Sequence, residues 1–423
     1  MNKKLGLAVA GALVAFASTA NAGISIPAGD WTVDISGNVN AFYIHNNSND
    51  SNVVQGGLAN AKGDNGSSSS SINTGLLPSW LTIGAKTRQN DLDVAWAISF
   101  QPGASSGTSL GGGGGSEFRQ AYLTFGDASW GTVKIGKDLG VFGSDAILSD
   151  MTLLGVGSQG LVGAAGGTTT TLGRIGAGYM YADFNGQINY TTPNWNGFQV
   201  TAGIDQPLAS LNTSTDGAST PATISGTISG NQKAPAFVAL AKYNFSANDV
   251  NGKVWAEVKS QKAYGAATAG SNTAAISDTS TVYGIGANVA TAGFTLTGYY
   301  YSGEGAGTTA FLMDGYSKAG KQRDSDGGYV QATYALPNVG TKLGVSWGIS
   351  NLDLASGETV GASATKGTVA ALVKENEMWT VGVYHPLTKS VNLVAEYSNV
   401  KSTNQKDQEN QSNIVSAGAI LFF

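Results

Sequence analysis

Apolar and polar residues alternate along most of this chain. Near its start, Trp31, Val33 and Ile35 are separated by Thr32 and Asp34. Successive side chains of a β-strand point to opposite faces, so this period of two predicts strands with one apolar and one polar row. The same period recurs at 94–100, 198–204, 343–349 and 415–423. The pattern predicts an all-β protein.

The connections between these segments alternate between short and long. Short turns are expected at 88–92, 126–129, 193–196, 291–293 and 387–389. Long polar links are expected at 45–79, 102–117, 138–185, 206–235, 262–280, 304–326, 351–375 and 399–412. Short turns at one end and long loops at the other are typical of outer-membrane barrels. We therefore predict a transmembrane antiparallel β-barrel of about 16 strands, with short periplasmic turns and long extracellular loops.

The two ends of the chain fit this interpretation. Lys3 and Lys4 precede an apolar stretch at 5–16, and small residues follow at 20–22, which predicts a secretory signal peptide over 1–22 and a barrel over 23–423. No later stretch approaches a membrane helix, so a membrane location would require a closed barrel. At the other end Phe423 terminates a row of apolar residues at every second position, as expected of a closing strand facing lipid.

Composition supports a barrel over a soluble domain. Charged residues make up 12% of the chain, against roughly 25% in a typical globular domain. Mean hydropathy is -0.04, because alternating rows average to neutrality. The chain has no Cys, so an exported protein of this kind would depend on a closed hydrogen-bond ladder or a large core. The net charge of -5, or -7 without Lys3 and Lys4, argues against nucleic-acid binding.

Two other protein classes fit less well. A soluble β-sandwich would alternate too, but its inner rows would hold more Leu and Phe, and a chain of this length would usually divide into domains. A barrel hydrolase would need a His paired with Ser or Asp. The two histidines, His45 and His385, are expected at opposite ends of the barrel and outside any nucleophile motif. We therefore expect no enzyme activity, cofactor or metal site.

Short motifs spread over the chain resemble those of the general Gram-negative trimeric porins. The segments 118–126 and 130–137 are similar to that family's Arg-x-Ala-aromatic and Phe/Trp-Gly-x-Val-x-x-Gly-Arg/Lys patterns. Residues 189–193 with 197–198 resemble its Tyr-x-Ser-Pro and Gly-Phe hairpin, and 381–384 with 387–390 resemble its Leu-Ser-Lys-Arg-Thr hairpin. With the signal peptide and Phe423, the resemblance spans the mature chain.

The resemblance implies a homotrimer in the outer membrane of a Gram-negative bacterium, in contact with membrane lipids and lipopolysaccharide. Small hydrophilic solutes and ions would diffuse passively through each water-filled barrel. The barrel assembly machinery would read Phe423 as part of the last-strand signal. The family's third loop folds into the lumen, and its counterpart here is expected at 138–173.

In that family, carboxylates of the inward loop face basic residues on the wall. The carboxylates of the matching loop here are Asp138, Asp145 and Asp150. Enterobacterial members carry Pro-Glu-Phe-Gly-Gly in this loop, whereas this chain has Thr-Leu-Leu-Gly at 152–155. The difference puts one acidic position of the constriction in doubt.

Strand parity supplies three basic candidates for the opposite wall. Lys86 and Arg88 share the polar row with Thr82 and Gly84, and Lys134 lies between Val133 and Ile135. A charge on the lipid face at the membrane midplane costs about 2–4 kcal/mol, so these side chains are expected in the lumen.

Three further basic candidates rest on weaker arguments. Arg119 is placed by its motif match. Lys137 has the wrong parity unless the strand ends at Gly136, and Arg174 lies near the end of the inward loop. We predict a constriction where Asp145 and Asp150 face Arg88, Arg119 and Lys134.

The sequence predicts a passive diffusion channel, and the alternative is a channel selective for a particular sugar, peptide or organic acid. A one-sign ladder of charges would favour anion uptake, and a slide of aromatic residues would favour sugars. The lumen rows instead carry scattered charges at Lys242, Lys253, Glu257, Lys259 and Glu396, and the consecutive Tyr299, Tyr300 and Tyr301 cannot all face the lumen. The long loops leave a surface adhesin or structural barrel as a third class. The sign of ion selectivity stays open.

Overall fold

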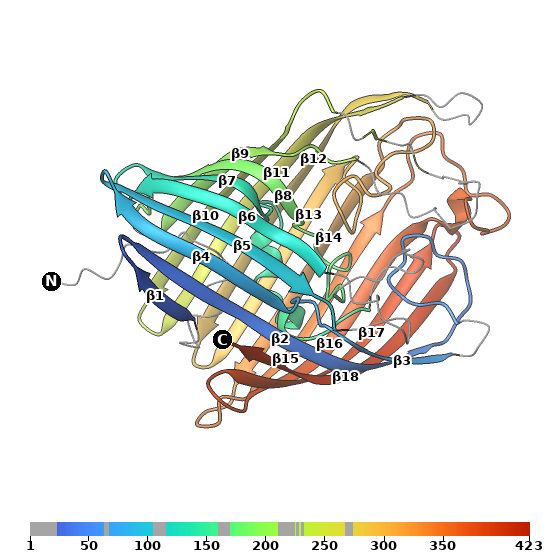
Figure 1. The fold of residues 1–423 in the computed structure, drawn as a ribbon. Coiled ribbons are helices and arrows are strands. Elements are labelled where there is room, and N and C mark those ends of the chain that lie inside the picture. The colour runs from blue at the N-terminus through green and yellow to red at the C-terminus, as the bar shows by residue number, and fades with distance from the viewer. Residues whose placement is uncertain are drawn as a thin grey trace.

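The computed structural model describes residues 23–62, 67–104, 116–159, 170–209, 225, 228–229, 232–266 and 274–423. The expected signal peptide lies outside this range. Sixteen of its strands form a closed antiparallel barrel (Figure 1). These are β2 (Trp31–Ser48), β4 (Trp80–Gln89), β5 (Leu92–Pro102), β6 (Ser116–Asp127), β7 (Gly131–Leu139), β8 (Phe184–Thr191), β9 (Phe198–Asp205), β10 (Ala236–Ala247), β11 (Val250–Gly265), β12 (Ile276–Thr291), β13 (Phe294–Glu304), β14 (Asp324–Ala335), β15 (Lys342–Leu352), β16 (Val373–Pro386), β17 (Val391–Asn404) and β18 (Glu409–Phe422).

Each barrel strand pairs with its neighbour in chain order, and β18 pairs with β2 to close the ring. Two additional strands flank β2. β1 (Ile24–Ala28) pairs with β2 beyond the end of β18, and β3 (Ser68–Asn73) pairs with β2 beyond the start of β4. β2 extends past its barrel neighbours, and the two extra strands provide hydrogen-bond partners for the backbone amides and carbonyls of these extensions.

The connections alternate in length as predicted, with one exception. Turns such as Asn90–Asp91 between β4 and β5 are tight, and both of those residues have positive φ values. The expected long link at 399–412 is wrong, because β17 and β18 continue to Asn404 and from Glu409, leaving 405–408 as a turn. Its polar residues suggest a loop, but they form the ends of two long strands.

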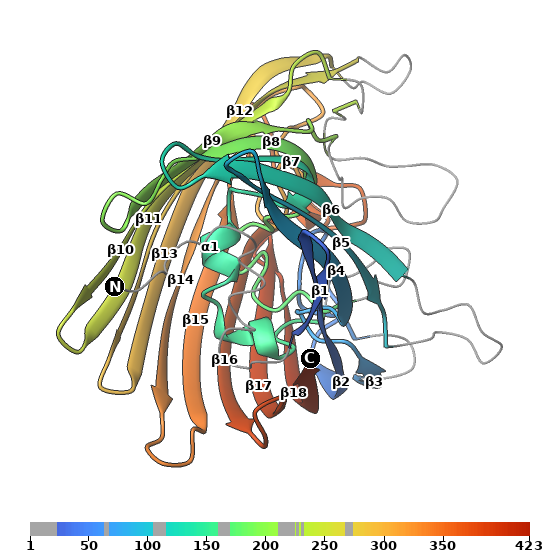
Figure 2. The same cartoon turned by 60° about the vertical axis from the view of Figure 1, so that its left-hand side comes forward.

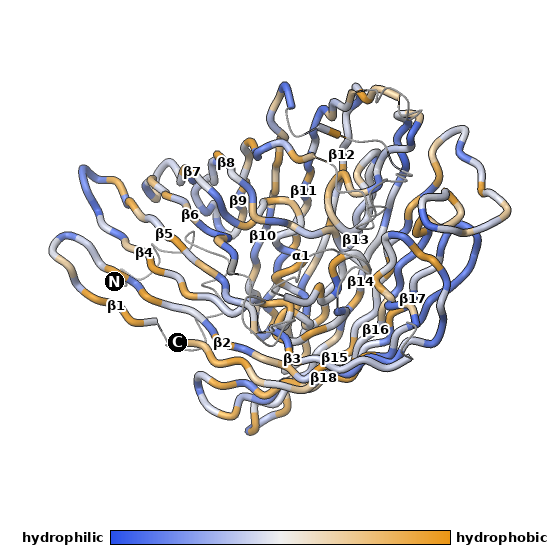
Figure 3. Tube along the Cα trace, turned by 45° about the vertical axis from the view of Figure 1, so that its right-hand side comes forward, coloured by the Kyte–Doolittle hydropathy of each residue, from blue (hydrophilic) through white to orange (hydrophobic). Residues whose placement is uncertain are grey.

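The two rows of each strand separate into an exterior and an interior face. On β18, Val415 and Leu421 are 51% and 41% exposed, whereas Ser416 and Ile420 between them are buried. On β13, Tyr300 is 52% exposed while its neighbours Tyr299 and Tyr301 point inward and are buried. Apolar and polar residues alternate along the strands in Figure 3, as the sequence pattern predicted.

Phe423 joins the last strand to the first. Its backbone N–H donates to the Gly37 carbonyl at 3.0 Å, and its own carbonyl accepts from the Gly37 N–H at 2.8 Å. A Cβ on Gly37 would lie 2.2 Å from the Trp80 carbonyl oxygen and 2.9 Å from the Phe423 ring. Glycine is therefore required where the closing residue crosses β2.

The connection between β7 and β8 enters the barrel. It carries the short helix α1 (Ser144–Ile147) and the 3-10 turn η2 (Met151–Leu154), and Figure 2 shows α1 inside the ring of strands. A second 3-10 turn, η3 (Val369–Ala371), precedes β16. The inward loop spans 140–183 between the strands, longer than the predicted 138–173.

The inward loop and two other loops pack a hydrophobic core inside the barrel. Phe142, Met151 and Tyr179 of the inward loop are buried together with inward-facing wall residues such as Tyr329. Leu58 from the link after β2 and Phe311 from the link after β13 join the same cluster. The loops therefore fill much of the space that the strands enclose.

Hydrogen bonds from one half of the wall hold the inward loop in place. Glu257 on β11 accepts the Gly143 N–H at 3.1 Å, and Gln331 on β14 accepts the Met151 N–H at 2.7 Å. Glu396 on β17 accepts the N–H groups of Val156 and Gly157 at 2.7 and 2.9 Å. A Cβ on Gly155 would lie 2.1 Å from Glu396 Oε1, so this contact requires glycine in the loop.

No helix in the described part of the chain is long and apolar enough to span a membrane.

We expect Glu396→Ala to loosen the inward loop without opening the barrel. The change leaves two buried amide N–H groups without acceptors, at a cost of about 1–3 kcal/mol each. Hydrogen–deuterium exchange of residues 151–159 is expected to rise while exchange in the strands stays the same. Ser398→Ala is the control, because Ser398 lies on the same strand and bonds to Thr380 on the neighbouring strand. Unchanged exchange at 151–159 in Glu396→Ala would show that this carboxylate does not hold the loop.

Candidate functional site: the narrowed lumen

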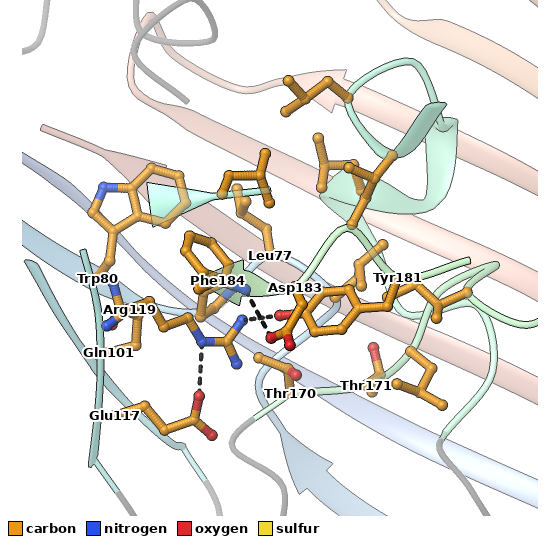
Figure 4. Close-up of a pocket in the computed structure, with 18 of the residues that line it drawn as sticks. Leu77, Trp80, Gln101, Glu117, Arg119, Thr170, Thr171, Tyr181, Asp183 and Phe184 are labelled. Carbon is orange, nitrogen blue, oxygen red and sulfur yellow. Dashed lines mark hydrogen bonds and ion pairs between the residues drawn. The ribbon is translucent and has the colours of Figure 1, made fainter. Parts of the chain in front are cut away.

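The inward loop lies against one half of the barrel and leaves a cavity beside the other half. Side-chain acceptors for its backbone amides come from β11, β14, β15 and β17, whereas the cavity is lined by residues of β4–β8, by the link before β4 and by the loop itself. The cavity measures about 260 Å³. Figure 4 shows the side chains that line it, with Trp80 and Arg119 at the left and Tyr181 at the right.

Most of the cavity wall is apolar. The wall strands contribute Trp80, Leu139 and Phe184. The inward loop contributes its aliphatic side chains, namely Ile147, Leu148, Leu153, Leu172 and Ile175. The link before β4 adds Leu76, Leu77 and Pro78, and it is fixed there because the amides of Leu76 and Leu77 donate to carbonyls of the inward loop. Such a lining differs from the charged ring that the sequence predicted.

One edge of the cavity is polar and centres on Arg119. Its Nε lies 2.8 Å from Glu117 Oε2, and its Nη1 lies 3.4 Å from the Tyr181 hydroxyl. The guanidinium also lies over the Phe184 ring, 5.5 Å from the ring centroid. Asp183 lies at the same edge and accepts the Phe184 N–H at 2.7 Å. Arg119 thus lines the cavity, and its ionic partner Glu117 is on its own strand.

Asp145 has basic partners on the wall, although not the predicted ones. Its Oδ1 lies 2.6 Å from Lys253 Nζ on β11, and its Oδ2 lies 3.5 Å from Lys242 Nζ on β10. The carboxylate is 7% exposed. Asp145 of the inward loop therefore contacts Lys242 and Lys253 of the wall, whereas the prediction placed it opposite Arg88, Arg119 and Lys134.

Asp150 does not face the basic wall. Its oxygens accept from the Thr152 amide and hydroxyl at 2.9 and 2.6 Å and from the Tyr179 hydroxyl at 2.9 Å, so it stabilises the fold of its own loop. Arg174 has no exposed surface and donates to the Met378 carbonyl and the Ser346 hydroxyl, which fixes the loop to the wall. Neither group is in contact with an open passage.

Asp138 and Lys134 lie on the lumen face of β7 and pair with each other. Asp138 is thus a wall residue rather than a loop residue, and Gln120 also donates to it at 2.9 Å. Lys137 lies on the exterior row of the same strand, because β7 continues past Gly136 to Leu139. It is exposed and donates to the Phe118 carbonyl at 2.8 Å, so its assignment to the constriction was wrong.

Lys86 and Arg88 occupy the lumen row of β4 but lie near the short-turn end of the barrel. Lys86 pairs with Asp34 at 2.7 Å. Arg88 pairs with Asp93 and Asp127 at 2.8 and 2.9 Å and is half exposed. Parity placed both on the correct face, but Arg88 does not meet Asp145 or Asp150, because parity carries no information about height along the strand.

Sequence reasoning missed several residues of this region. Glu117 and Asp183 at the polar edge were not considered, although Glu117 is adjacent to the porin-like motif at 118–126. Glu257 and Glu396 were noted only as scattered lumen charges. The aliphatic residues of the inward loop gave no signal, because a short apolar run in a loop does not reveal what it faces.

Nothing in the described residues forms a metal site of three or more His, Cys, Asp or Glu side chains. His45 Nδ1 lies 2.9 Å from the Ser70 hydroxyl, and His385 Nδ1 lies 2.8 Å from the Thr341 hydroxyl. His45 is near the long-loop end of β2, and His385 is beside the short turn after β16.

Solved outer-membrane channels share this architecture. The outer-membrane channel DcaP of Acinetobacter baumannii is 14% identical, with 95% of this chain and 100% of that chain covered at a TM-score of 0.62. The in-vitro folded trimer form of OmpT from Vibrio cholerae is 16% identical, with 93% and 99% covered at a TM-score of 0.52. OmpF of Salmonella typhi is 12% identical, with 95% and 100% covered at a TM-score of 0.53. At these identities the likeness shows the fold.

No curated protein sequence matches this chain. The family model described as Gram-negative porin matches residues 8–405, which is nearly the whole length. With a closed barrel of sixteen strands and a loop inside it, the chain belongs to the Gram-negative porin family.

Proposed function

We propose that solutes cross this outer-membrane diffusion channel through the cavity between the inward loop and the β4–β8 wall. The observation that carries the proposal is the division of the lumen. Anchors from β11 and β14–β17 fix the loop to one half of the barrel, and the cavity lies beside the other half. That the protein is a channel follows from its membership of the porin family.

Charges at the polar edge of the cavity are expected to govern ion preference. Glu117 is 45% exposed and Arg119 is 11% exposed, so the carboxylate offers more surface to a passing ion. In contrast, Asp145 is nearly covered by its two lysines and the loop. Fixed charges in a narrow pore act within a Debye length of about 8–10 Å, so the edge outweighs charges on the distant loops.

A catalytic role has little support. In the part of the chain that the structure describes, each histidine hydrogen-bonds to a hydroxyl and not to a carboxylate, and the two lie at opposite ends of the barrel. A hydrolytic triad needs an acid that orients the histidine. We therefore propose a non-enzymatic channel.

We also propose that the protein assembles as a homotrimer. The OmpT structure of Vibrio cholerae to which the fold is similar is a trimer form. Exterior rows such as Tyr283, Ile285 and Val330 on β12 and β14 expose large apolar side chains suited to lipid or to a second copy.

Ion selectivity tests the location of the path. Glu117→Gln is expected to move the permeability ratio toward anions, and Arg119→Gln toward cations, each by about twofold or more because these charges are only partly screened. Arg88→Gln is the control, since Arg88 lies at the short-turn rim with Asp93 and Asp127. Reversal potentials across a salt gradient in planar bilayers measure the ratio. If Arg88→Gln shifts it and the two cavity variants do not, the path lies elsewhere.

Gel migration with and without heating, and the mass of the protein in detergent, test whether it forms a trimer. Unheated protein in denaturing detergent is expected to migrate at three times the mass of the heated chain, because closed barrels buried against each other resist the detergent. Light scattering in mild detergent gives an independent mass. A monomer by both methods would contradict the proposal.

Assembly tests the proposed role of Phe423 as a signal. Phe423→Ser keeps the two backbone hydrogen bonds to Gly37 and removes only the terminal ring. We expect less folded barrel in the outer membrane and unchanged export across the inner membrane. Leu421→Ser is the control, because Leu421 lies on the same exterior row and is 41% exposed. Equal loss of folded protein in both variants would show that row hydrophobicity matters rather than the terminal aromatic residue.

A further inference from the structure

The apolar lining of the cavity is unusual for a path that carries only hydrophilic solutes. Twelve of its nineteen lining residues are aliphatic, aromatic or proline, and six of these are leucine. Such walls hold water weakly, whereas they gain free energy when they contact the hydrocarbon part of a solute. The lining therefore favours a solute with an apolar body.

The polar edge of the same cavity carries an excess of negative charge. Its ionised groups are Glu117, Asp183 and Arg119, which sum to -1. Arg119 is engaged by Glu117, by the Tyr181 hydroxyl and by the Phe184 ring, and only 11% of its side chain is exposed. The more exposed charge is the Glu117 carboxylate, at 45%. The partly exposed Glu117 carboxylate can therefore accept a hydrogen bond from a cationic solute, and Figure 4 shows this carboxylate next to Arg119, its ionic partner.

The size of the cavity sets the size of the solute. Its 260 Å³ is slightly below the roughly 300–1,000 Å³ of sites for drug-sized ligands. A single ring or a short branched chain with one polar group fits this volume.

We propose that the cavity is a binding site for small amphipathic organic cations, in which a primary ammonium group is attached to one aromatic or branched hydrocarbon body. The ammonium group donates to Glu117 and Asp183, and the body lies against the leucines of the inward loop. This inference rests on the proposed path but makes a separate claim, because a path through the cavity does not require any solute to bind there.

Equilibrium binding tests the site directly. Benzylammonium is titrated by calorimetry into the full-length trimer or monomer in detergent, and three probes are compared with it. Methylammonium lacks the apolar body, benzyl alcohol lacks the charge, and benzoate reverses it. Benzylammonium is expected to bind about tenfold or more tightly than each of the three, since both a charge-assisted hydrogen bond and apolar burial contribute. Equal or tighter binding of benzoate would overturn the proposal.

Variants assign the binding to this cavity. Glu117→Gln with Asp183→Asn is expected to weaken benzylammonium binding about tenfold or more. Asparagine also tolerates the left-handed backbone at Asp183, where φ is 59°, so this change spares the loop. Leu148→Ser is expected to weaken benzylammonium but not methylammonium. Asp34→Asn is the matched control, because Asp34 is a partly exposed carboxylate that pairs with Lys86 outside the cavity.

Conductance separates this proposal from the proposed path. Benzylammonium binding in detergent together with interruptions of single-channel current supports both. Binding without interruption of the current supports the site and contradicts the path. Normal conductance with no binding overturns the site and leaves the path standing. If Leu148→Ser raises conductance while benzylammonium still fails to bind, the leucines act as a dewetting gate and the proposal is wrong.

Discussion

Closure of the backbone hydrogen-bond ladder is the constraint on which the rest of this structure depends. In hydrocarbon no water can satisfy a free amide or carbonyl, so a strand that crosses a membrane needs a partner on both sides. β18 provides the last partner by pairing with β2, and the reciprocal bonds between Phe423 and Gly37 complete the seam. The absence of a side chain at Gly37 follows from this closure, since the Trp80 carbonyl and the Phe423 ring occupy the space.

Closure also decides what the interior can contain. A ring of sixteen strands encloses more space than wall side chains fill, so the loops determine the width of the passage. Here the inward loop carries enough apolar residues to build a core with the wall, and buried Glu257 and Glu396 accept its amides. Burying these acceptors is costly unless they are paired, so each one specifies where the loop must lie. Glu396 can approach the loop backbone this closely only at Gly155, because a Cβ there would clash with the carboxylate.

The sequence could predict the strands but not the contacts between distant parts of the chain. Period-two alternation identified both faces of β4, β13 and β18, because the signal is local and the two faces differ in solvent. It could not predict how far each side chain lies from the two ends of the barrel. Arg88 and Lys86 are on the expected face yet near the rim, and Asp145 meets Lys242 and Lys253, which are about a hundred residues away in the chain. The lumen position predicted for Lys137 required β7 to end at Gly136, but the strand continues through this glycine to Leu139.

The division of the lumen separates the residues that hold the fold from those that meet a solute. Glu257, Gln331 and Glu396 bond to the backbone of the inward loop, so a change at any of them disturbs the loop whatever passes through the barrel. Leu148 and Glu117 are on the cavity side, where Glu117 pairs with Arg119. Substitutions there alter the chemistry of the passage at little cost to the barrel. Because these three acceptors lie on β11, β14 and β17, the polarity of the β4–β8 side can vary while they stay in place, and one barrel can serve either general diffusion or selective uptake.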